Sequence, residues 1–199
     1  MKPTKPRKKT GAVARPAARP EALLTELREL ILSVRSQVAQ TVNAGLALLY
    51  WRVGDRIRRE ILKEKRAEYG AEIVSALSRQ LEIEFGRGFG EKSLRHMIRF
   101  AEAFPDVKIV SSLLRQLSWT HFLSVLYLKD PLQRDFYAEM CRIERWSTRT
   151  LQERIQSMLY ERTALSKKPK KLIEQELKTL RAEDRLTPDL VFRDPYFLD

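Results

Sequence analysis

The sequence predicts an all-α fold, with a long N-terminal helix or helical hairpin followed by a helix-turn-helix-like helical bundle. Apolar residues recur three and four positions apart through most of the chain, which is the spacing of one buried helix face. Proline falls between these apolar runs. The chain shows neither alternating apolar patterns nor an Asn-Gly hairpin signal, so strands are not expected.

Composition favours a folded, basic protein. Of 199 residues, 43% are apolar, which is ample for a core, and the net charge of +12 indicates a polyanionic partner. Residues 1–20 carry seven Lys or Arg, four prolines and no acid, which predicts a disordered basic tail and leaves +5 for the rest. The sequence contains no apolar run long enough to span a membrane and no secretory signal. We therefore expect no membrane partner and a cytoplasmic location.

The segment 21–65 reads as helix almost throughout. Its first part has the three-four spacing of a coiled-coil seam, formed by Leu24, Leu27, Ile31, Val34 and Val38. Such a seam must be covered by another helix or another subunit. We therefore expect a possible homodimer through the helix Leu24–Val38.

The chain is organised around residues 69–104, which read as helix, tight turn, helix. The first helix is expected to bury Ile73, Leu77, Leu81 and Phe85. Three glycines in the segment 86–90 permit positive φ angles and a sharp reversal. The second helix is expected to bury Leu94, Ile98 and Ala101 and to end before Pro105.

The other face of this second helix is basic. It carries Lys92, Ser93, Arg95, His96 and Arg99. Two short helices with a glycine turn and such a face are typical of a helix-turn-helix. A plain helical hairpin with a solvated basic face fits the same residues, and this segment alone does not separate the two.

Further helices follow, each with a recognisable start. Ser118 is a good N-cap, Pro131 suits a first helical turn, and Ser147-Thr148 is a second N-cap. The expected inner residues are Trp119, Phe122, Leu123 and Leu126, then Phe136, Met140 and Ile143, then Leu151, Ile155, Met158 and Leu159. After a basic linker, a helix over 172–184 should bury Ile173, Leu177 and Leu180.

The residues of common active sites are missing. The two histidines, His96 and His121, have no partners at metal-ligand spacing, and the one cysteine, Cys141, falls at an apolar helical position. The glycine segment follows a helix and lacks the Gly-Lys-Ser/Thr ending of a phosphate loop. We expect no catalytic residue, no metal and no cofactor.

Several segments together resemble one family. They are Tyr50-Trp51-Arg52-Val53-Gly54, Tyr69-Gly70, Phe85-Gly86-Arg87-Gly88-Phe89, Gln116-Leu117-Ser118-Trp119-Thr120-His121, Arg145-Trp146-Ser147 and Leu159-Tyr160-Glu161-Arg162. They are similar to the N-terminal helical domain of YhcG-like bacterial proteins, which precedes a PD-(D/E)xK nuclease domain. The resemblance spans about Leu23 to Arg162 and implies a helix-turn-helix DNA-binding region. The departure is Gly90, where a Ser-type cap is expected.

This resemblance divides the chain into a tail (1–20), a helical DNA-binding and oligomerisation domain (21–162), and a linker, short helix and start of a missing nuclease domain (163–199). Its implied partner is double-stranded DNA. In a helix-turn-helix, the first residues of the second helix reach base edges. We assign Lys92, Ser93, Arg95 and His96 to the groove, Arg87 and Arg99 to phosphates, and Arg149 and Arg154 to a secondary phosphate set.

The alternative is a protein-interaction and oligomerisation module with no direct nucleic-acid contact. In that hypothesis the coiled-coil seam makes the functional contact and the basic face is only solvated.

The absence of a recognisable catalytic site predicts that this chain does not cleave DNA. Metal-dependent phosphodiester cleavage needs carboxylates that converge on a divalent ion. The acids of this chain are spread among lysines and arginines at spacings that suit surface pairs. The purified 199-residue chain should therefore not cut plasmid or linear duplex DNA in Mg²⁺ or Mn²⁺. Cleavage that survives repurification and disappears on mutation of an acid in this chain would contradict the prediction.

Overall fold

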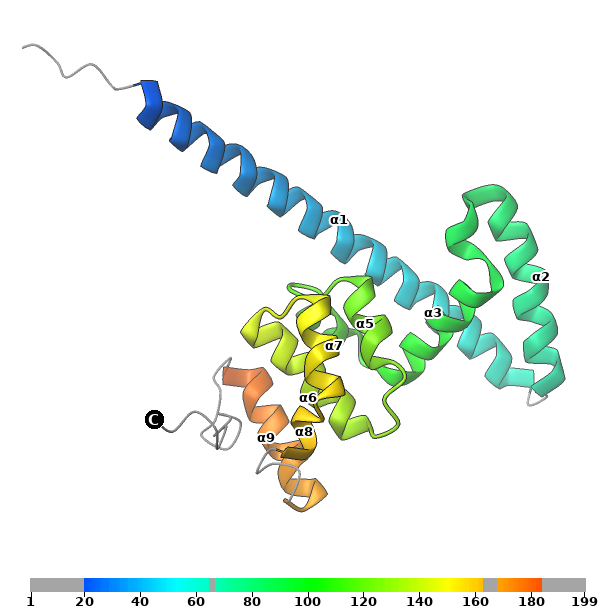
Figure 1. Ribbon diagram of the computed structural model, residues 1–199. Coiled ribbons are helices and arrows are strands. Elements are labelled where there is room, and N and C mark those ends of the chain that lie inside the picture. Colours follow the sequence, from blue (N-terminus) through cyan, green and yellow to red (C-terminus); the bar gives the residue numbers. More distant parts are fainter. Residues whose placement is uncertain (1–19, 65–66, 163–167, 184–199) are drawn as a thin grey trace, which may run out of the picture. The chain divides into compact units, whose positions relative to one another are not determined.

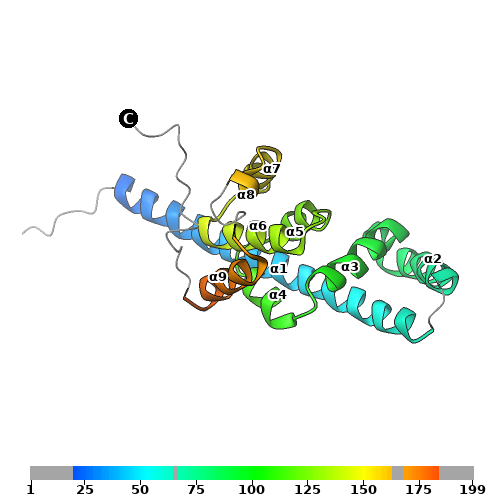
Figure 2. The same cartoon turned by 90° about the horizontal axis from the view of Figure 1, so that it is seen from below.

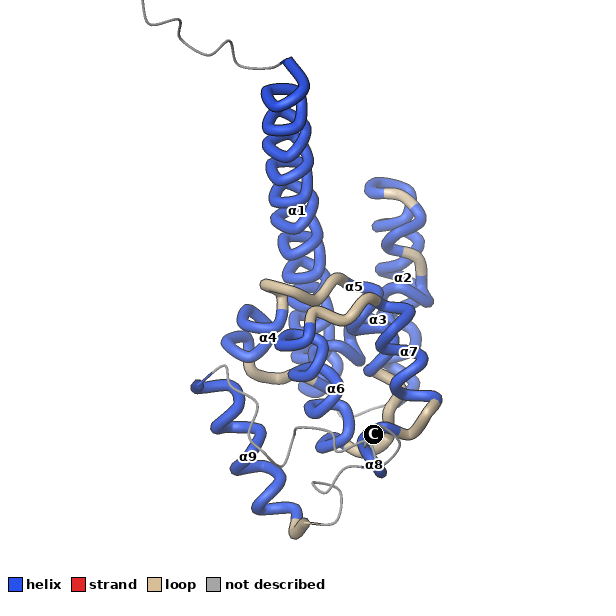
Figure 3. Tube along the Cα trace, turned by 60° about the vertical axis from the view of Figure 1, so that its left-hand side comes forward, coloured by secondary structure: helices blue, strands red, loops and turns tan. Residues whose placement is uncertain are grey.

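The computed structural model describes residues 20–64, 67–162 and 168–183. Within these ranges the chain is all-α, as predicted, with no strand (Figure 3). None of the described helices combines the length and apolar character needed to cross a membrane. The elements, labelled in Figure 1, are α1 (Pro20–Glu64), α2 (Ala67–Phe85), the 3₁₀ turn η1 (Arg87–Phe89), α3 (Glu91–Ala103), α4 (Val107–Leu113), α5 (Trp119–Val125), α6 (Pro131–Glu144), α7 (Thr148–Gln156), α8 (Leu159–Arg162) and α9 (Lys170–Glu183).

The chain divides into two units, Met1–Val38 and Ala39–Asp199. The described part of the first unit is helical, and all its side chains from Glu21 to Val38 are exposed. These include the five seam residues Leu24, Leu27, Ile31, Val34 and Val38. The predicted basic tail lies outside the described residues except for Pro20, and so do 184–199. The first helix runs on to Glu64, so it is one long helix rather than a hairpin.

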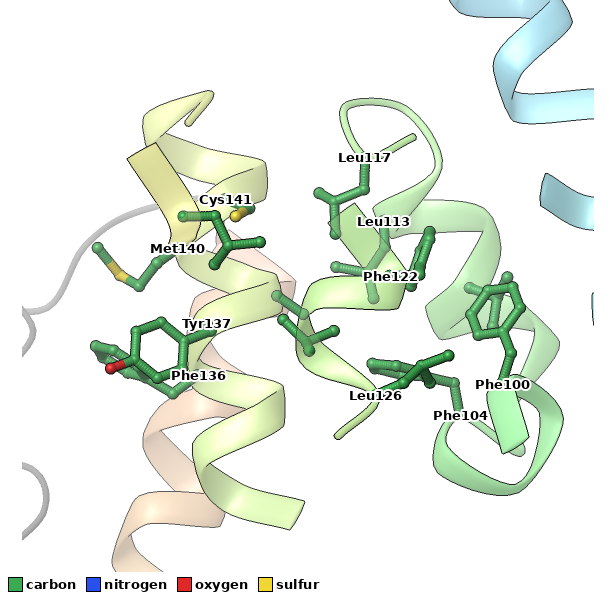
Figure 4. Packing of buried hydrophobic residues seen from close by; sticks show 14 of the residues in the cluster. Phe100, Phe104, Leu113, Leu117, Phe122, Leu126, Phe136, Tyr137, Met140 and Cys141 are labelled. Carbon is green, nitrogen blue, oxygen red and sulfur yellow. The ribbon is translucent and has the colours of Figure 1, made fainter. Parts of the chain in front are cut away.

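The main core of the second unit has aromatic side chains at both ends, Phe100 and Phe104 at one and Phe136 and Tyr137 at the other, with Leu113, Leu117 and Leu126 between them (Figure 4). Phe100 of α3 packs against Phe122 of α5 with ring centroids 4.4 Å apart, and Phe104 closes the cluster 5.6 Å from Phe122. On α6, Phe136 and Tyr137 are fully buried. Cys141 is a core residue, as predicted, and burial raises the pKa of its thiol to about 12.

The second half of α1 is tied directly to α3, beside which it lies in Figure 2. The indole Nε1 of Trp51 donates to the carbonyl of Phe104, the C-cap of α3, at 2.8 Å. One helical turn along α1, Gly54 lies so close to α3 that a Cβ there would overlap the Met97 carbonyl. Tyr50, the residue before Trp51, extends these contacts to two further elements. Its ring packs against Trp119 of α5 at 5.0 Å and Phe89 of η1 at 6.2 Å.

The predicted inner face of α2 is confirmed in part, because Ile73 and Leu81 are half-buried and pack against a core cluster of α1, α2 and α3 residues. The structure buries Gly70, Val74 and Ser78, while Leu77 and Phe85 are 38% and 63% exposed. Small residues decide this, because a Cβ on Gly70 would lie 3.0 Å from the Ile61 side chain of α1. The Ser78 hydroxyl is satisfied by donating to the Ser75 carbonyl of its own helix. A helix approaches most closely through its small side chains, even where larger apolar residues lie beside them.

The reversal after α2 depends on one glycine rather than three. Gly86 adopts φ 89°, a left-handed conformation that glycine tolerates best, whereas Gly88 and Gly90 have no positive φ. Gly90 is instead the extended N-cap of α3.

The predicted helix starts downstream are confirmed. Ser118 forms a capping box with His121, the Asp130 side chain accepts from the Leu132 amide ahead of Pro131, and Ser147 accepts from the Thr150 amide. Met158, predicted as an inner residue of the helix that starts at Thr148, is instead exposed with φ 54°, and the helix is interrupted there between α7 and α8. Helix α4, capped by Asp106, was not expected.

Helix α9 packs on α6, although the sequence analysis placed it beyond the helical domain that ends at residue 162. Its predicted inner residues Ile173, Leu177 and Leu180 are all buried. Beside them, Glu139 of α6 is 1% exposed and accepts from Arg142 at 2.8 Å and from Arg181 of α9 at 2.5 Å. Two guanidinium groups thus compensate one buried carboxylate, which fixes α9 on the bundle.

The contact between α1 and α3 predicts a large difference between two identical substitutions on α1. Gly54→Ala forces the backbones of α1 and α3 apart and should lower the free energy of unfolding by about 1–3 kcal/mol. Gly45→Ala is the control, because a Cβ there meets nothing within 4 Å. It should raise stability by about 0.5–1 kcal/mol through helix propensity. Urea denaturation of both variants measures the difference, and equal stabilities would show that the close contact is not required.

Candidate nucleic-acid interface

Helix α3 has a fixed inner face and an open outer face. Leu94, Met97, Phe100 and Ala101 are buried, so the predicted inner residues Leu94 and Ala101 are confirmed. Ile98 is only half-buried, and Met97 and Phe100, which were not predicted, take the central positions. The connector, residues 86–90, joins α2 to α3 and holds the start of α3 in place. Within it, the Phe89 ring packs between Tyr50 and Phe85.

The outer face brings together four of the predicted site residues. Lys92, Arg95, His96 and Arg99 fall within an arc of about 100° around the helix axis, given 3.6 residues per turn. Lys92, Arg95 and Arg99 are exposed and His96 is half-exposed. Ser93 is half-buried at the border of this face. Three cationic side chains therefore share the outer face of α3, with the exposed acids Glu91 and Glu102 at its edge.

Arg95 is held by an acid of its own helix. Its Nη2 and Nε atoms lie 2.6 Å and 3.1 Å from the Glu91 carboxylate, one turn earlier. Both side chains are about half exposed, so the pair contributes little to stability. Arg95 can exchange this partner for another anion at small cost.

His96 and Arg99 both contact Tyr127, which the sequence analysis missed. The Tyr127 hydroxyl lies 2.7 Å from His96 Nδ1, and the Arg99 guanidinium carbon lies 4.6 Å from the centre of the Tyr127 ring. Arg99 Nε also donates to the Leu126 carbonyl at 3.2 Å. Tyr127 follows α5, 31 residues beyond His96, and no spacing in the sequence connects them.

The imidazole of His96 is electrostatically disfavoured as a cation. Its pKa is lowered by burial first, and then by the positive charges of Lys92 and Arg99. The neutral imidazole is therefore the dominant form at neutral pH. An anion beside it would act in the opposite direction and raise this pKa.

The remaining predicted residues lie on other elements. Arg87 is exposed on η1, in the connector that precedes α3. Arg149 and Arg154 belong to α7, which packs on α5. The Arg149 side chain is 90% exposed and pairs with Glu153, and Arg154 lies over the Trp146 ring at 5.9 Å. The structure thus assembles four of the eight residues on one helix face.

Acids border the interface at its start. The Glu82 carboxylate lies 3.2 Å from where a Cβ on Gly90 would be, and Glu91 occupies the first turn of α3. Across the part of the chain that the structure describes, no three His, Cys, Asp or Glu side chains converge as metal ligands would. Of these two acids, Glu91 forms a surface pair with Arg95.

Fold and site define an all-helical protein that presents a cationic helix face on an aromatic core. The chain belongs to the DUF1016 N-terminal domain family, whose model matches residues 26–162. It is thereby a member of the YhcG-like group. It is 29% identical over 200 residues to a protein of Escherichia coli K12 named "Putative nuclease YhcG". The match covers 85% of this chain and 52% of the relative, so the chain spans about half the length of that relative. No solved structure matches it.

Proposed function

We propose that this chain is a double-stranded DNA-binding module of a nuclease-related bacterial protein, acting in the cytoplasm and itself non-catalytic. The observation that carries the proposal is the outer face of α3, where Lys92, Arg95, His96 and Arg99 gather on a helix whose opposite face packs against the core. The name of the Escherichia coli relative, "Putative nuclease YhcG", supports a nucleic-acid partner for this chain.

In this proposal α2, the connector and α3 act as a helix-turn-helix. The first turns of α3 enter the major groove, so that Lys92, Ser93 and Arg95 reach base edges together with His96. Arg87 and Arg99 contact phosphates on either side. Arg149 and Arg154, on α7, form a secondary set that adds sequence-independent attraction.

The packing of α3 supports this role energetically. Rigid presentation of a helix removes most of the ordering cost that a flexible segment meets on binding. The hydrogen bond from Trp51 to the end of α3 and the contact at Gly54 provide that rigidity.

Substitutions on the outer face should separate base contacts from charge effects. If Arg95 meets a guanine edge, Arg95→Ala should cost about 1–3 kcal/mol and relax specificity at one position. Lys92→Ala should weaken binding at low salt. Lys178→Ala is the matched control, since Lys178 is also exposed but belongs to α9 rather than α3. Fluorescence anisotropy with a random-sequence duplex and with a selected duplex measures both effects. Unchanged affinity in both α3 variants would contradict DNA binding by this face.

Self-association is the second candidate function, and the exposed first part of α1 favours it. Leu24, Leu27, Ile31, Val34 and Val38 lie along one side of the helix, flanked by exposed Leu23 and Leu30. A second copy offers the same apolar face, which suits a self-complementary two-fold interface. The protein would then be a homodimer through Leu24–Val38.

One pair of charge insertions tests the homodimer. Leu27→Glu places a charge in the centre of this face and should give monomers at tens of micromolar. Leu32→Glu is the control, because Leu32 is also exposed but lies on the other side of the helix. Sedimentation velocity distinguishes them. A wild-type monomer, or equal sedimentation of both variants and the wild type, would contradict dimerisation through this segment.

A further inference from the structure

Tyr127 is an exposed aromatic residue whose contacts are both with cationic or basic side chains of α3. It is 53% exposed and directly follows Leu126, the buried C-cap of α5. Burial of Leu126 fixes the backbone on one side of Tyr127. Its ring and hydroxyl are thereby held against α3 rather than in the core.

The hydroxyl of Tyr127 engages one ring nitrogen of His96, Nδ1, and leaves the other, Nε2, for a further partner. It lies 2.7 Å from His96 Nδ1, and the two rings meet edge-on at 89° with centroids 5.7 Å apart. When the phenol donates to Nδ1, the neutral imidazole carries its proton on Nε2. His96 then presents an N–H donor on the side away from Tyr127.

The ring of Tyr127 orients the guanidinium group of Arg99. The guanidinium lies over the ring at 4.6 Å, and its Nε donates to the Leu126 carbonyl, so the N–H donors of the two Nη groups are not used in these two contacts. Lys92 lies on the same face, one turn before His96, because positions 92, 96 and 99 are four and three residues apart. Arg134 of α6 adds positive charge close to Arg99, while Asp130 and Asp135 act on Arg134 in the opposite direction.

These groups share one chemical property. The Nη groups of Arg99, the ammonium of Lys92 and the Nε2–H of His96 are all donors, and none can accept a hydrogen bond. No base presents more than two acceptors in the major groove, the N7 and O6 of guanine, whereas a phosphate presents acceptors only, on several exposed oxygens, and can serve three separate donor groups.

We propose that Tyr127 organises His96 and Arg99 into a site for one phosphate of the DNA backbone. The inference rests on the proposed function and changes one part of it, because it moves His96 from a base contact to a phosphate contact. Tyr127 is the positioning residue. A free phosphate group has the same chemistry, so inorganic phosphate and duplex DNA are tested separately.

The duplex arm uses the full chain and two substitutions at Tyr127. Tyr127→Ala removes both contacts and should raise the Kd for duplex DNA by roughly three- to tenfold. It should also reduce the slope of log K against log salt by about one, although no charge on the protein has changed. Tyr127→Phe keeps the ring beneath Arg99 and should give a smaller loss. Melting temperatures confirm that both variants fold.

The phosphate arm follows the imidazole signals of both histidines by NMR. Inorganic phosphate should raise the pKa of His96 in the wild type and not in Tyr127→Ala. His121 is the internal control, because its two nitrogens are engaged by Ser118 and the Trp146 carbonyl.

The outcomes separate the inference from the function on which it rests. If Tyr127→Ala binds duplex with wild-type Kd and salt slope while Lys92→Ala is weakened, the phosphate site is wrong and DNA binding stands. If the wild type binds no duplex, the proposed function fails, and a rise in the His96 pKa with phosphate alone would still support an anion site. Failure to see that rise would overturn the site as well.

Discussion

The contact between the backbones of α1 and α3 at Gly54 and Met97 sets the geometry on which the second unit depends. No side chain separates the two helices there, so any residue other than glycine must push α3 away from α1. Three residues earlier, Trp51 reaches the end of α3 with a buried hydrogen bond. A displaced α3 would break that bond and open the cluster around Phe100, so one glycine constrains both the core and the exposed helix face.

The same constraint explains why α3 can carry so many polar side chains on its outer face. Four residues of its thirteen are buried, and they supply its attachment to the core. The outer residues contribute little to folding, since an exposed pair such as Arg95 and Glu91 is worth little. Substitution there can change binding without changing the fold. The buried residues of α3 thus stabilise the helix on the core, and its exposed residues determine what the helix can bind.

Sequence reasoning was most reliable where one local signal decides the structure. Ser118 and Ser147 cap the starts of α5 and α7, as their short hydroxyl side chains predict. Helix α9 buries the three apolar residues that the helical spacing of the sequence predicts. Sequence reasoning was wrong where packing between helices decides. In α2 the small residues Gly70 and Ser78 are buried, whereas the larger apolar residues Leu77 and Phe85 stay exposed. Of the candidate site, the cationic face of α3 was predictable, but Tyr127 was not, because it comes from another helix through tertiary structure.

Glu91 stabilises the start of α3 in the unbound protein and still allows Arg95 to bind an anion. As an acid in the first turn of α3 it interacts favourably with the positive end of the helix dipole. It also holds the Arg95 guanidinium in place over the next turn. An arriving phosphate or base edge would compete for Arg95, and the carboxylate would keep its interaction with the helix terminus. The exchange therefore gives up only a weak exposed pair, whereas Arg99 and His96 remain oriented by Tyr127 throughout. On this argument, affinity would come mainly from the part of the face that Tyr127 organises, and discrimination from the part that Glu91 releases.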